Sequence, residues 1–390
     1  GLPEENKVLA CQKAQAVGKE GWLLTLDHPT FEPVMKYVRS REVRRELYVA
    51  YVTRCRDGDF SNVSIIKDLL NLRRKLAEIL GHRDFVDYIL ENRMAKKGEI
   101  AFEFVDDLTK ETKPYWIRDI AHLREHSQEL GLVELQPWDV DFVKENLRST
   151  LFGIDDETTR PYFPIQRVFE GLFKLVEEVF GLVVVEKKIE EVWHPEVRFY
   201  EIFSRIGNEK LGCFYTDWHP REGKRQGAWM NDLKTGGPSH DGFEAHTGII
   251  AGNLTPVKGD IPALLTHREV QTVFHEFGHL LHHLTSSVPI APMAGINVVW
   301  DFVEVPSQLM ENWTWEDEIL PLISCHYETG EALPTEISSQ LRAGRQYMGG
   351  LNQMRQLALG YLDLRLHRDE PAETSSKLMH YIESILLPYS

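Results

Sequence analysis

Residues 272–285 read TVFHEFGHLLHHLT, an apolar stretch that contains four histidines. Within it, His275, Glu276 and His279 form the pattern H-E-x-x-H. On an α-helix, residues four apart lie on one face a single turn apart, so two imidazoles at this spacing can bind one metal ion from the same side. The carboxylate of Glu276 can then reach a water molecule at the open position of that ion. The pattern predicts His275 and His279 as metal ligands.

The other residues of this stretch predict a buried helix. Apolar residues surround most of its circumference, namely Val273, Phe274, Phe277, Leu280, Leu281 and Leu284. Polar groups on a buried helix need partners, and a metal ion is one such partner. The alternative is a helix whose histidines are solvated or packed in the core. Because chance alone would give about 0.1 H-E-x-x-H patterns in a chain of this composition, the metal interpretation is favoured.

The third ligand is expected from a second element. Val299 to Trp315 reads VWDFVEVPSQLMENWTW and is predicted to form an apolar helix that contains three carboxylates. We predict Glu304 as the third ligand, because a buried carboxylate opposite two histidines completes a two-His, one-Glu zinc site. Glu311 and Asp301 are candidates for orienting the ligand histidines through their second ring nitrogen. For all three carboxylates the alternative is an ordinary ion pair.

Two further histidines, His282 and His283, lie near the same helix face. Either one could in principle be a third histidine ligand. However, successive turns rise about 5.4 Å each, so three ligands on one straight helix converge poorly on a tetrahedral centre. We therefore expect these two side chains to pack or to contact ligands rather than bind the metal.

This ligand set predicts hydrolytic chemistry at a single zinc ion. Two histidines and one carboxylate leave a fourth position for water, whose pKa falls towards neutrality on the metal. Glu276 would then take a proton as zinc-bound water attacks a polarised carbonyl. Ligand type sets a preference for zinc and leaves cobalt and manganese open.

Composition limits the partners and the compartment. The formal net charge of -16 argues against nucleic acid or an anionic membrane, and weakly favours neutral or basic peptides. Four widely spaced cysteines without a C-x-x-C pair indicate buried thiols in a reducing compartment. We expect a cytoplasmic protein without membrane spans, with a monomer favoured. An organellar location stays open, because the first residue is Gly rather than Met and a targeting segment could have been removed.

Periodicity predicts helices in most of the chain and strands in one region. Helical spacing occurs at 43–55, 63–80, 98–130 (interrupted at Pro114) and 163–181, and again after Leu320. Short β-branched or aromatic runs occur at 182–186, 197–202, 211–217 and 228–230. Glycine content predicts loops at 236–242 and 295–298. The expected sheet either offers an edge strand to a peptide substrate or has a structural role alone.

The two segments around the predicted ligands also carry a family resemblance. They read THREVQTVFHEFGHLLHHLTS (266–286) and WDFVEVPSQLMENWTWE (300–316) and resemble the signature of the thimet-type zinc oligopeptidases. The resemblance continues along the chain through GWLLTLDHP, LQPWDV, RPYFP, VWHPEVRFYE, FYTDWHPREGKRQGAWM, ALLTH, CHYETG and LRLH. It implies that His275, His279 and Glu304 hold zinc and that Glu276 is the general base.

The resemblance also implies an architecture. The fold would be mainly α, a two-lobed zincin-type metallopeptidase with a small β-sheet lining a channel between the lobes. Residues 47–238 would form the lobe with the sheet, and residues 1–46 with 239–390 would form the catalytic lobe. A deep channel of this kind would admit only short, unstructured peptides, which implies an endopeptidase acting on such substrates.

The sequence departs from the family at both ends, where family members are longer. Beyond the last residue of this chain they carry a Gly-Tyr-rich loop whose His and Tyr side chains donate to the substrate carbonyl, and Tyr381 and Tyr389 lie in a different context. Losing such oxyanion donors commonly costs about 100- to 1000-fold in turnover. The alternative function is therefore a catalytically impaired zinc- and peptide-binding fragment.

Overall fold

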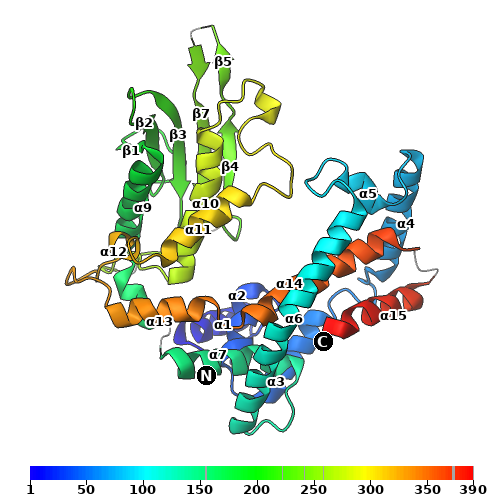
Figure 1. Cartoon of the computed structure of the whole chain (residues 1–390). Coiled ribbons are helices and arrows are strands. Elements are labelled where there is room, and N and C mark those ends of the chain that lie inside the picture. Colours follow the sequence, from blue (N-terminus) through cyan, green and yellow to red (C-terminus); the bar gives the residue numbers. More distant parts are fainter. Residues whose placement is uncertain (154–155, 222, 241, 258, 371–373, 390) are drawn as a thin grey trace. The chain divides into compact units, whose positions relative to one another are not determined.

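The chain forms two compact units, shown in the computed structural model of Figure 1. The structure describes residues 1–153, 156–221, 223–240, 242–257, 259–370 and 374–389. Unit 1 comprises Gly1–Gly153 with Gln346–Ser390, and unit 2 comprises Ile154–Arg345. Helices predominate and the described strands lie in unit 2, which confirms a mainly α fold with a small sheet. Of the helices in the described ranges, none combines the length and hydropathy that a membrane span requires.

Unit 1 consists of helices in its described part. They are α1 (Glu4–Ala16), α2 (His28–Tyr37), α3 (Arg41–Val52), α4 (Val63–Ile79), α5 (Phe85–Leu90), α6 (Gly98–Glu129), α7 (Val140–Phe152), α14 (Gly349–Arg368) and α15 (Ser375–Leu386), with short 3₁₀ turns at Pro137–Asp139 and Leu387–Tyr389. The start of α14 packs closely on α6, because a Cβ at Gly350 would lie 2.5 Å from the backbone nitrogen of Trp116. The Leu351 N–H donates to the Asp119 carboxylate across the same contact.

Helix α6 corrects one prediction. Pro114 was expected to interrupt it, but α6 is one helix of 32 residues that continues through this proline. A proline inside a helix loses one backbone hydrogen bond and costs about 3 kcal/mol. Because α6 packs on α7 and α14, tertiary contacts outweigh this local cost.

Unit 2 contains a five-stranded sheet in the order β1-β2-β3-β7-β4. Neighbouring strands are antiparallel except β3 and β7, which are parallel. The strands are β1 (Leu182–Lys187), β2 (Arg198–Ser204), β3 (Lys210–Asp217), β4 (Trp229–Lys234) and β7 (His246–Ala251), and a separate two-stranded ribbon joins β5 (Gly237–Ser239) to β6 (Gly242–Glu244). The first four strands were predicted. The ribbon occupies residues 237–239 and 242 of the expected loop at 236–242, of which residue 241 lies outside the described residues. Strand β7 was missed because Gly248 hides its strand pattern.

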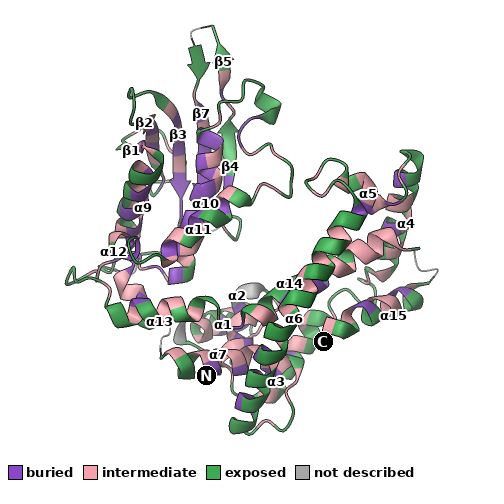
Figure 2. Cartoon of the chain, in the orientation of Figure 1, coloured by how far each residue is buried: buried purple, intermediate pink, exposed green. Residues whose placement is uncertain are grey.

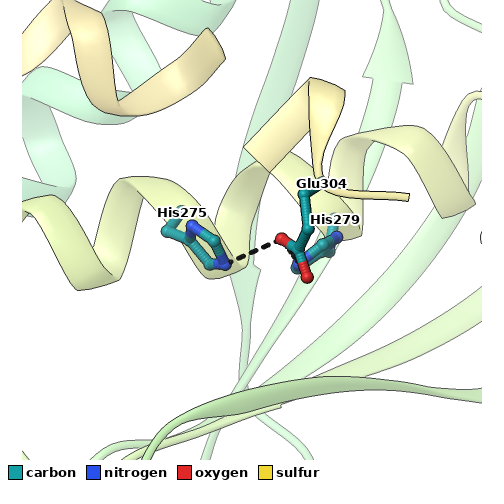
Figure 3. A group of neighbouring side chains, drawn as sticks. All are labelled: His275, His279 and Glu304. Carbon is teal, nitrogen blue, oxygen red and sulfur yellow. Dashed lines mark ion pairs between the residues drawn. The ribbon is translucent and has the colours of Figure 1, made fainter. Parts of the chain in front are cut away.

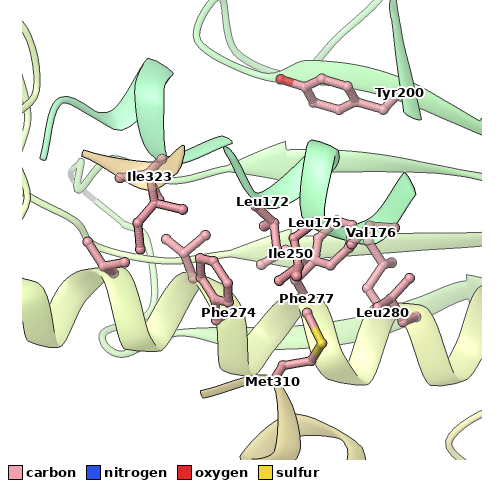
Figure 4. Packing of buried hydrophobic residues seen from close by; sticks show 14 of the residues in the cluster. Leu172, Leu175, Val176, Tyr200, Ile250, Phe274, Phe277, Leu280, Met310 and Ile323 are labelled. Atoms are coloured by element: carbon pink, nitrogen blue, oxygen red, sulfur yellow. The ribbon is translucent and has the colours of Figure 1, made fainter. Parts of the chain in front are cut away.

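The described helices of unit 2 are α8 (Asp156–Thr159), α9 (Ile165–Phe180), α10 (His267–Leu284), α11 (Val305–Asn312), α12 (Leu320–Ile323) and α13 (Thr335–Arg345), with 3₁₀ turns at Arg160–Tyr162, Ala291–Met293 and Trp313–Trp315. Two of these helices, α9 and α10, pack on this sheet. Figure 4 shows α9 and α10 sharing one apolar cluster with the strands, which includes Leu172, Leu175, Tyr200, Ile250, Phe274, Phe277, Leu280 and Met310. Gly248 on β7 leaves room for the side chain of Leu280, because a Cβ on Gly248 would lie 2.6 Å from the Leu280 Cδ1. Helix α10 therefore lies close to the sheet.

The two units differ from the predicted lobes. The expected boundary at 46/47 falls inside α3, and the one at 238/239 falls inside β5. The sheet was assigned to the lobe facing the metal helix, yet both belong to unit 2. The physical reason is that β3, β4 and β7 bury their apolar side chains against α10, and a single core is not divided between domains. The channel expected between lobes stays a prediction.

Candidate metal centre

Helix α10 begins at a capping box that the sequence specifies locally. The Thr266 hydroxyl accepts from the Glu269 N–H at 3.1 Å, and the Glu269 carboxylate accepts from the Thr266 N–H at 2.7 Å. These two bonds satisfy donors that the first helical turn leaves unpaired. Most of the helix is buried, as Figure 2 shows, and it carries His275, Glu276 and His279 in its central turns.

The segment that supplies Glu304 is shorter than predicted. The expected helix from Val299 to Trp315 is limited to α11, Val305–Asn312, followed by a 3₁₀ turn. Glu304 lies immediately before this helix and its side chain is 52% exposed, so the prediction of a buried carboxylate inside a helix was wrong. Pro306 lies in the first turn of α11, where a missing backbone N–H removes no intrahelical hydrogen bond.

A glycine between the two histidines allows α11 to approach α10. A Cβ on Gly278 would lie 2.6 Å from the Cα of Ser307 and 2.7 Å from the Pro306 carbonyl oxygen. Ser307 is fully buried at this crossing, and its hydroxyl donates to the Glu304 Oε2 at 2.7 Å. The close crossing and this hydrogen bond together hold the Glu304 carboxylate towards α10.

The structure brings the three predicted ligands together. Figure 3 shows Glu304 pointing at both rings: its Oε2 lies 3.3 Å from the Nε2 of His275 and 3.2 Å from the Nε2 of His279. One ligand atom from each residue lies within 4.8 Å of the others, and no second such group occurs in the described ranges. Two donors at about 2.0–2.1 Å from a tetrahedral zinc ion lie roughly 3.3 Å apart. The donor set and its spacing therefore fit zinc.

Glu311 orients one of these rings. Its Oε1 accepts from the Nδ1–H of His275 at 2.7 Å, which leaves Nε2 with its lone pair for a metal. This hydrogen bond raises the pKa of His275, whereas burial lowers the pKa of His279. Asp301, the other candidate for orienting a ligand, is exposed in the turn before Glu304, and its role stays a prediction.

Glu276 occupies a different environment from Glu304. It is 6% exposed, and burial raises the pKa of its carboxyl to about 7, with the negative charge of Glu304 acting in the same direction. The positive charge of His275 and the backbone N–H of Met230 on β4 oppose this rise. A carboxyl group whose pKa lies near neutrality can both accept and release a proton at physiological pH.

The two histidines that were not expected to be ligands lie outside the group of three. His283 is fully buried, and its Nε2 contacts two backbone carbonyls rather than a ligand atom. His282 is half-buried beside the ring of Phe302. Neither belongs to the group of potential metal ligands that the described residues form.

Comparison with known proteins places the chain in a family. The family model described as Peptidase family M3 matches residues 34–386. The chain belongs to peptidase family M3. Within the family it is 41% identical over 396 residues to Oligopeptidase A of Escherichia coli, which covers 99% of this chain and 58% of the relative. It is also 36% identical to the organellar oligopeptidase A of Arabidopsis thaliana (94% and 48% covered) and 31% identical to the dipeptidyl carboxypeptidase of Escherichia coli (94% and 54% covered).

The chain spans about half the length of these family members. The match extends over nearly all of the present sequence but over 48–58% of each relative. The activity of the full-length relatives is therefore a matter for proposal in this chain.

Three residues that position the candidate centre were not predicted from the sequence, namely Gly278, Ser307 and Met230. Gly278 had a recognisable signal, because a glycine inside a strong helical pattern usually has a packing reason. Ser307 follows Glu304 by three residues, a spacing that allows a local hydrogen bond. The contribution of Met230 is a backbone N–H brought near Glu276 by the sheet, and no residue type indicates that.

Proposed function

We propose that this chain carries the catalytic centre of a zinc-dependent endopeptidase that hydrolyses short, unstructured peptides. The supporting observation is the convergence of His275, His279 and Glu304 beside the buried carboxyl of Glu276. Family membership makes peptide-bond hydrolysis the reaction to expect from these residues. The oligopeptidase names of several relatives favour short peptides as substrates.

In this proposal each residue has one role. His275, His279 and Glu304 hold one zinc ion, which when bound lowers the pKa of a water molecule and polarises the scissile carbonyl. Glu276 accepts a proton from the attacking water on its carboxylate oxygen and then transfers that proton to the leaving amine nitrogen. Glu311 keeps the His275 ring turned towards the ion through Nδ1.

The proposed substrate path follows strand β4. It is the edge strand next to β7, and its residues from Asn231 to Lys234 are exposed. An extended peptide can pair with such an edge through backbone hydrogen bonds, largely independent of its side chains. Because Met230 at the start of β4 lies near Glu276, a peptide along this edge would pass the metal centre. We therefore propose that the sheet binds substrate through β4, rather than having a structural role alone.

The remaining features of the proposal concern partners and compartment. Zinc is the preferred ion, with cobalt and manganese as substitutes that a two-His, one-Glu site also accepts. We propose a cytoplasmic protein, with an organellar location as the second choice, since the relatives include a probable cytosolic and an organellar oligopeptidase A of Arabidopsis thaliana. A monomer without nucleic-acid or membrane partners is the favoured state.

A cleavage assay tests the proposal. The chain loaded with zinc should cleave a fluorogenic peptide of about eight residues, and a chelator should abolish this activity. Glu276→Gln should retain zinc, because Glu276 is not a ligand, and should lose cleavage by at least about 100-fold.

The same assay distinguishes an active endopeptidase from the alternative, a catalytically impaired zinc- and peptide-binding fragment. Tight peptide binding with bound zinc but no turnover by the unsubstituted chain would support the impaired fragment instead. Loss of zinc from Glu276→Gln would contradict the role of Glu276 as base. Atomic absorption measures the zinc content of each protein. Glu276→Asp is the variant that keeps the negative charge at this position.

A further inference from the structure

A pair of buried histidines lies beyond the metal ligands on α10 and takes no part in the proposed chemistry. His283 on α10 and His246 at the start of β7 are both fully buried, with ring centroids 4.9 Å apart. Burying a polar ring is costly unless its nitrogen atoms are hydrogen-bonded. The partners of these rings therefore indicate what the pair holds together.

His283 joins the edge strand to its neighbour. Its Nε2 atom lies 3.3 Å from each of two backbone carbonyl oxygens and donates towards both. They are those of Lys234 at the end of β4 and Thr247 in β7. These two strands pair antiparallel, but their register shifts between Asp232 and Lys234. Such an irregularity disrupts the ladder locally and leaves backbone groups without a strand partner. His283 supplies a donor at this point of the sheet.

The other nitrogen of His283 fixes which tautomer is present. No hydrogen-bond partner of its Nδ1 occurs among the described residues, and this atom faces Gly295, where a Cβ would lie 2.5 Å from it. Burial lowers the pKa of His283, so the ring is neutral and carries its proton on Nε2. Because Gly295 lies in the segment that leads to Glu304, the ring also contacts the connection between α10 and α11.

His246 holds the same junction from the other side. The Gly236 N–H, just after β4, donates to its Nδ1 at 2.9 Å, and its Nε2–H donates to the Ser286 carbonyl oxygen, just after α10, at 2.9 Å. Gly236 is itself tightly enclosed, since a Cβ there would lie 2.0 Å from the Glu244 carbonyl oxygen. The base of the β5–β6 ribbon is thereby attached to the end of the metal helix.

Strand β4 is consequently attached to α10 at two points. Glu276 and His283 are seven residues apart and lie on one face of the helix. The Met230 N–H lies near the first, and the Lys234 carbonyl bonds the second. Seven helical residues rise about 10 Å and four strand residues span about 13 Å, so the strand runs alongside this face.

We propose that His283, supported by His246, is a positioning residue that holds the edge strand β4 in register beside the metal centre. This inference rests on the proposed function, in which a peptide pairs with β4. A strand that loses such an attachment frays or changes its pairing, and a shift by one residue turns every side chain to the other face. Loss of the attachment would therefore impair peptide binding while the three ligands still hold the ion.

The experiment compares three variants of the full chain. His283→Leu removes the donor, and His283→Gln retains a side-chain N–H for the same carbonyls. Leu175→Ala destabilises the same core from α9, a helix that packs on β1 at the far side of the sheet order from β4. Hydrogen exchange of the segment 229–236 should become about tenfold faster in His283→Leu and return towards the original rate in His283→Gln. Leu175→Ala should lower the melting temperature without selectively accelerating exchange in this segment.

Kinetics provide the second measurement. In His283→Leu the KM for an eight-residue peptide should rise about tenfold, with zinc content unchanged and kcat within about threefold, because the lost interaction contributes to binding. Unchanged exchange in 229–236, or a loss that His283→Gln does not restore, would overturn the proposal. Failure of the unsubstituted chain to cleave any peptide would refute the proposed function instead, and the exchange data would still decide the attachment of β4.

Discussion

The two helices that meet at the candidate metal centre are built in different ways. Helix α10 has 18 residues, begins at a capping box and is buried along most of its length. Helix α11 has 8 residues, begins without a side-chain cap and leaves Glu304 half-exposed at its start. The first therefore has its own local reasons to be a helix, whereas the second depends on what it packs against.

Because of this difference, the two helices contribute to the site in different ways. Helix α10 fixes His275 and His279 relative to each other through helical spacing alone. Three contacts with α10 hold Glu304 near them: the crossing at Gly278, the Glu311–His275 hydrogen bond, and a bond from His267 to the Thr314 carbonyl in the 3₁₀ turn after α11. We infer that substituting a ligand on α10 weakens metal binding the most. The third ligand, Glu304, has a position that can adjust to the ion.

The largest expected effect comes from removing ligands on the two helices. His279→Ala should weaken zinc binding by more than the roughly 10- to 100-fold typical of an outer-shell partner, because only one histidine and one carboxylate remain. Glu304→Ala should cost less, since water can occupy the place of its exposed carboxylate. Competition with a fluorescent chelator measures both affinities.

Gln308→Ala on α11 is the matched control, because this exposed residue is not among the potential ligands. Its zinc affinity should equal that of the unsubstituted chain. A larger loss for Glu304→Ala than for His279→Ala would reverse the comparison of the two helices.

The second expected effect concerns pH and the hydrogen bond between the start of α10 and the 3₁₀ turn that follows α11. Burial lowers the pKa of His267 from 6.5 to about 4, and its Nε2–H donates to the Thr314 carbonyl at 3.0 Å. Above pH 6.5 the ring is neutral in the folded and unfolded chain. As pH falls from 6.5 to about 4 the unfolded chain binds the proton first, so stability falls, by about 3 kcal/mol in total.

His267→Gln separates this contribution from that of other histidines, because it keeps an N–H for Thr314 but does not titrate. Denaturant unfolding between pH 8 and pH 4 should show a shallower acid loss in the variant. Parallel curves for both proteins across this window would show that His267 does not carry the effect.

The smallest of the three effects is at the helix crossing. Gly278→Ala places a Cβ 2.6 Å from the Cα of Ser307, so α11 has to move away. We expect a loss of about 1–3 kcal/mol in stability from this overpacking, together with weaker zinc binding as Glu304 moves. Gly344→Ala on α13 is the control, since nothing lies within 4 Å of a Cβ there and alanine favours a helix by about 1 kcal/mol. Equal stability changes in the two variants would mean that the crossing tolerates a methyl group.

The same difference between the helices separates what the sequence predicts correctly from what it does not. The sequence predicted α10, α9 and the first four strands, because apolar periodicity and Gly181 at the end of α9 are local signals. It predicted a break at Pro114, where tertiary packing outweighs the local pattern, and a long helix at 299–315, and both were wrong. The lobe boundaries differed because the sheet and the metal helix share one core, which no local pattern reveals.

The sequence by itself determined the spacing of His275, Glu276 and His279, since four residues make about one helical turn whatever surrounds the helix. It also determined the residue types that a zinc ion prefers. Only the tertiary structure decided that Glu304 reaches both rings, that Glu276 is buried and that β4 lies beside it. These depend on contacts between segments distant in sequence, where a missing Cβ at Gly278 and two buried histidine rings set distances that no pattern of neighbours encodes.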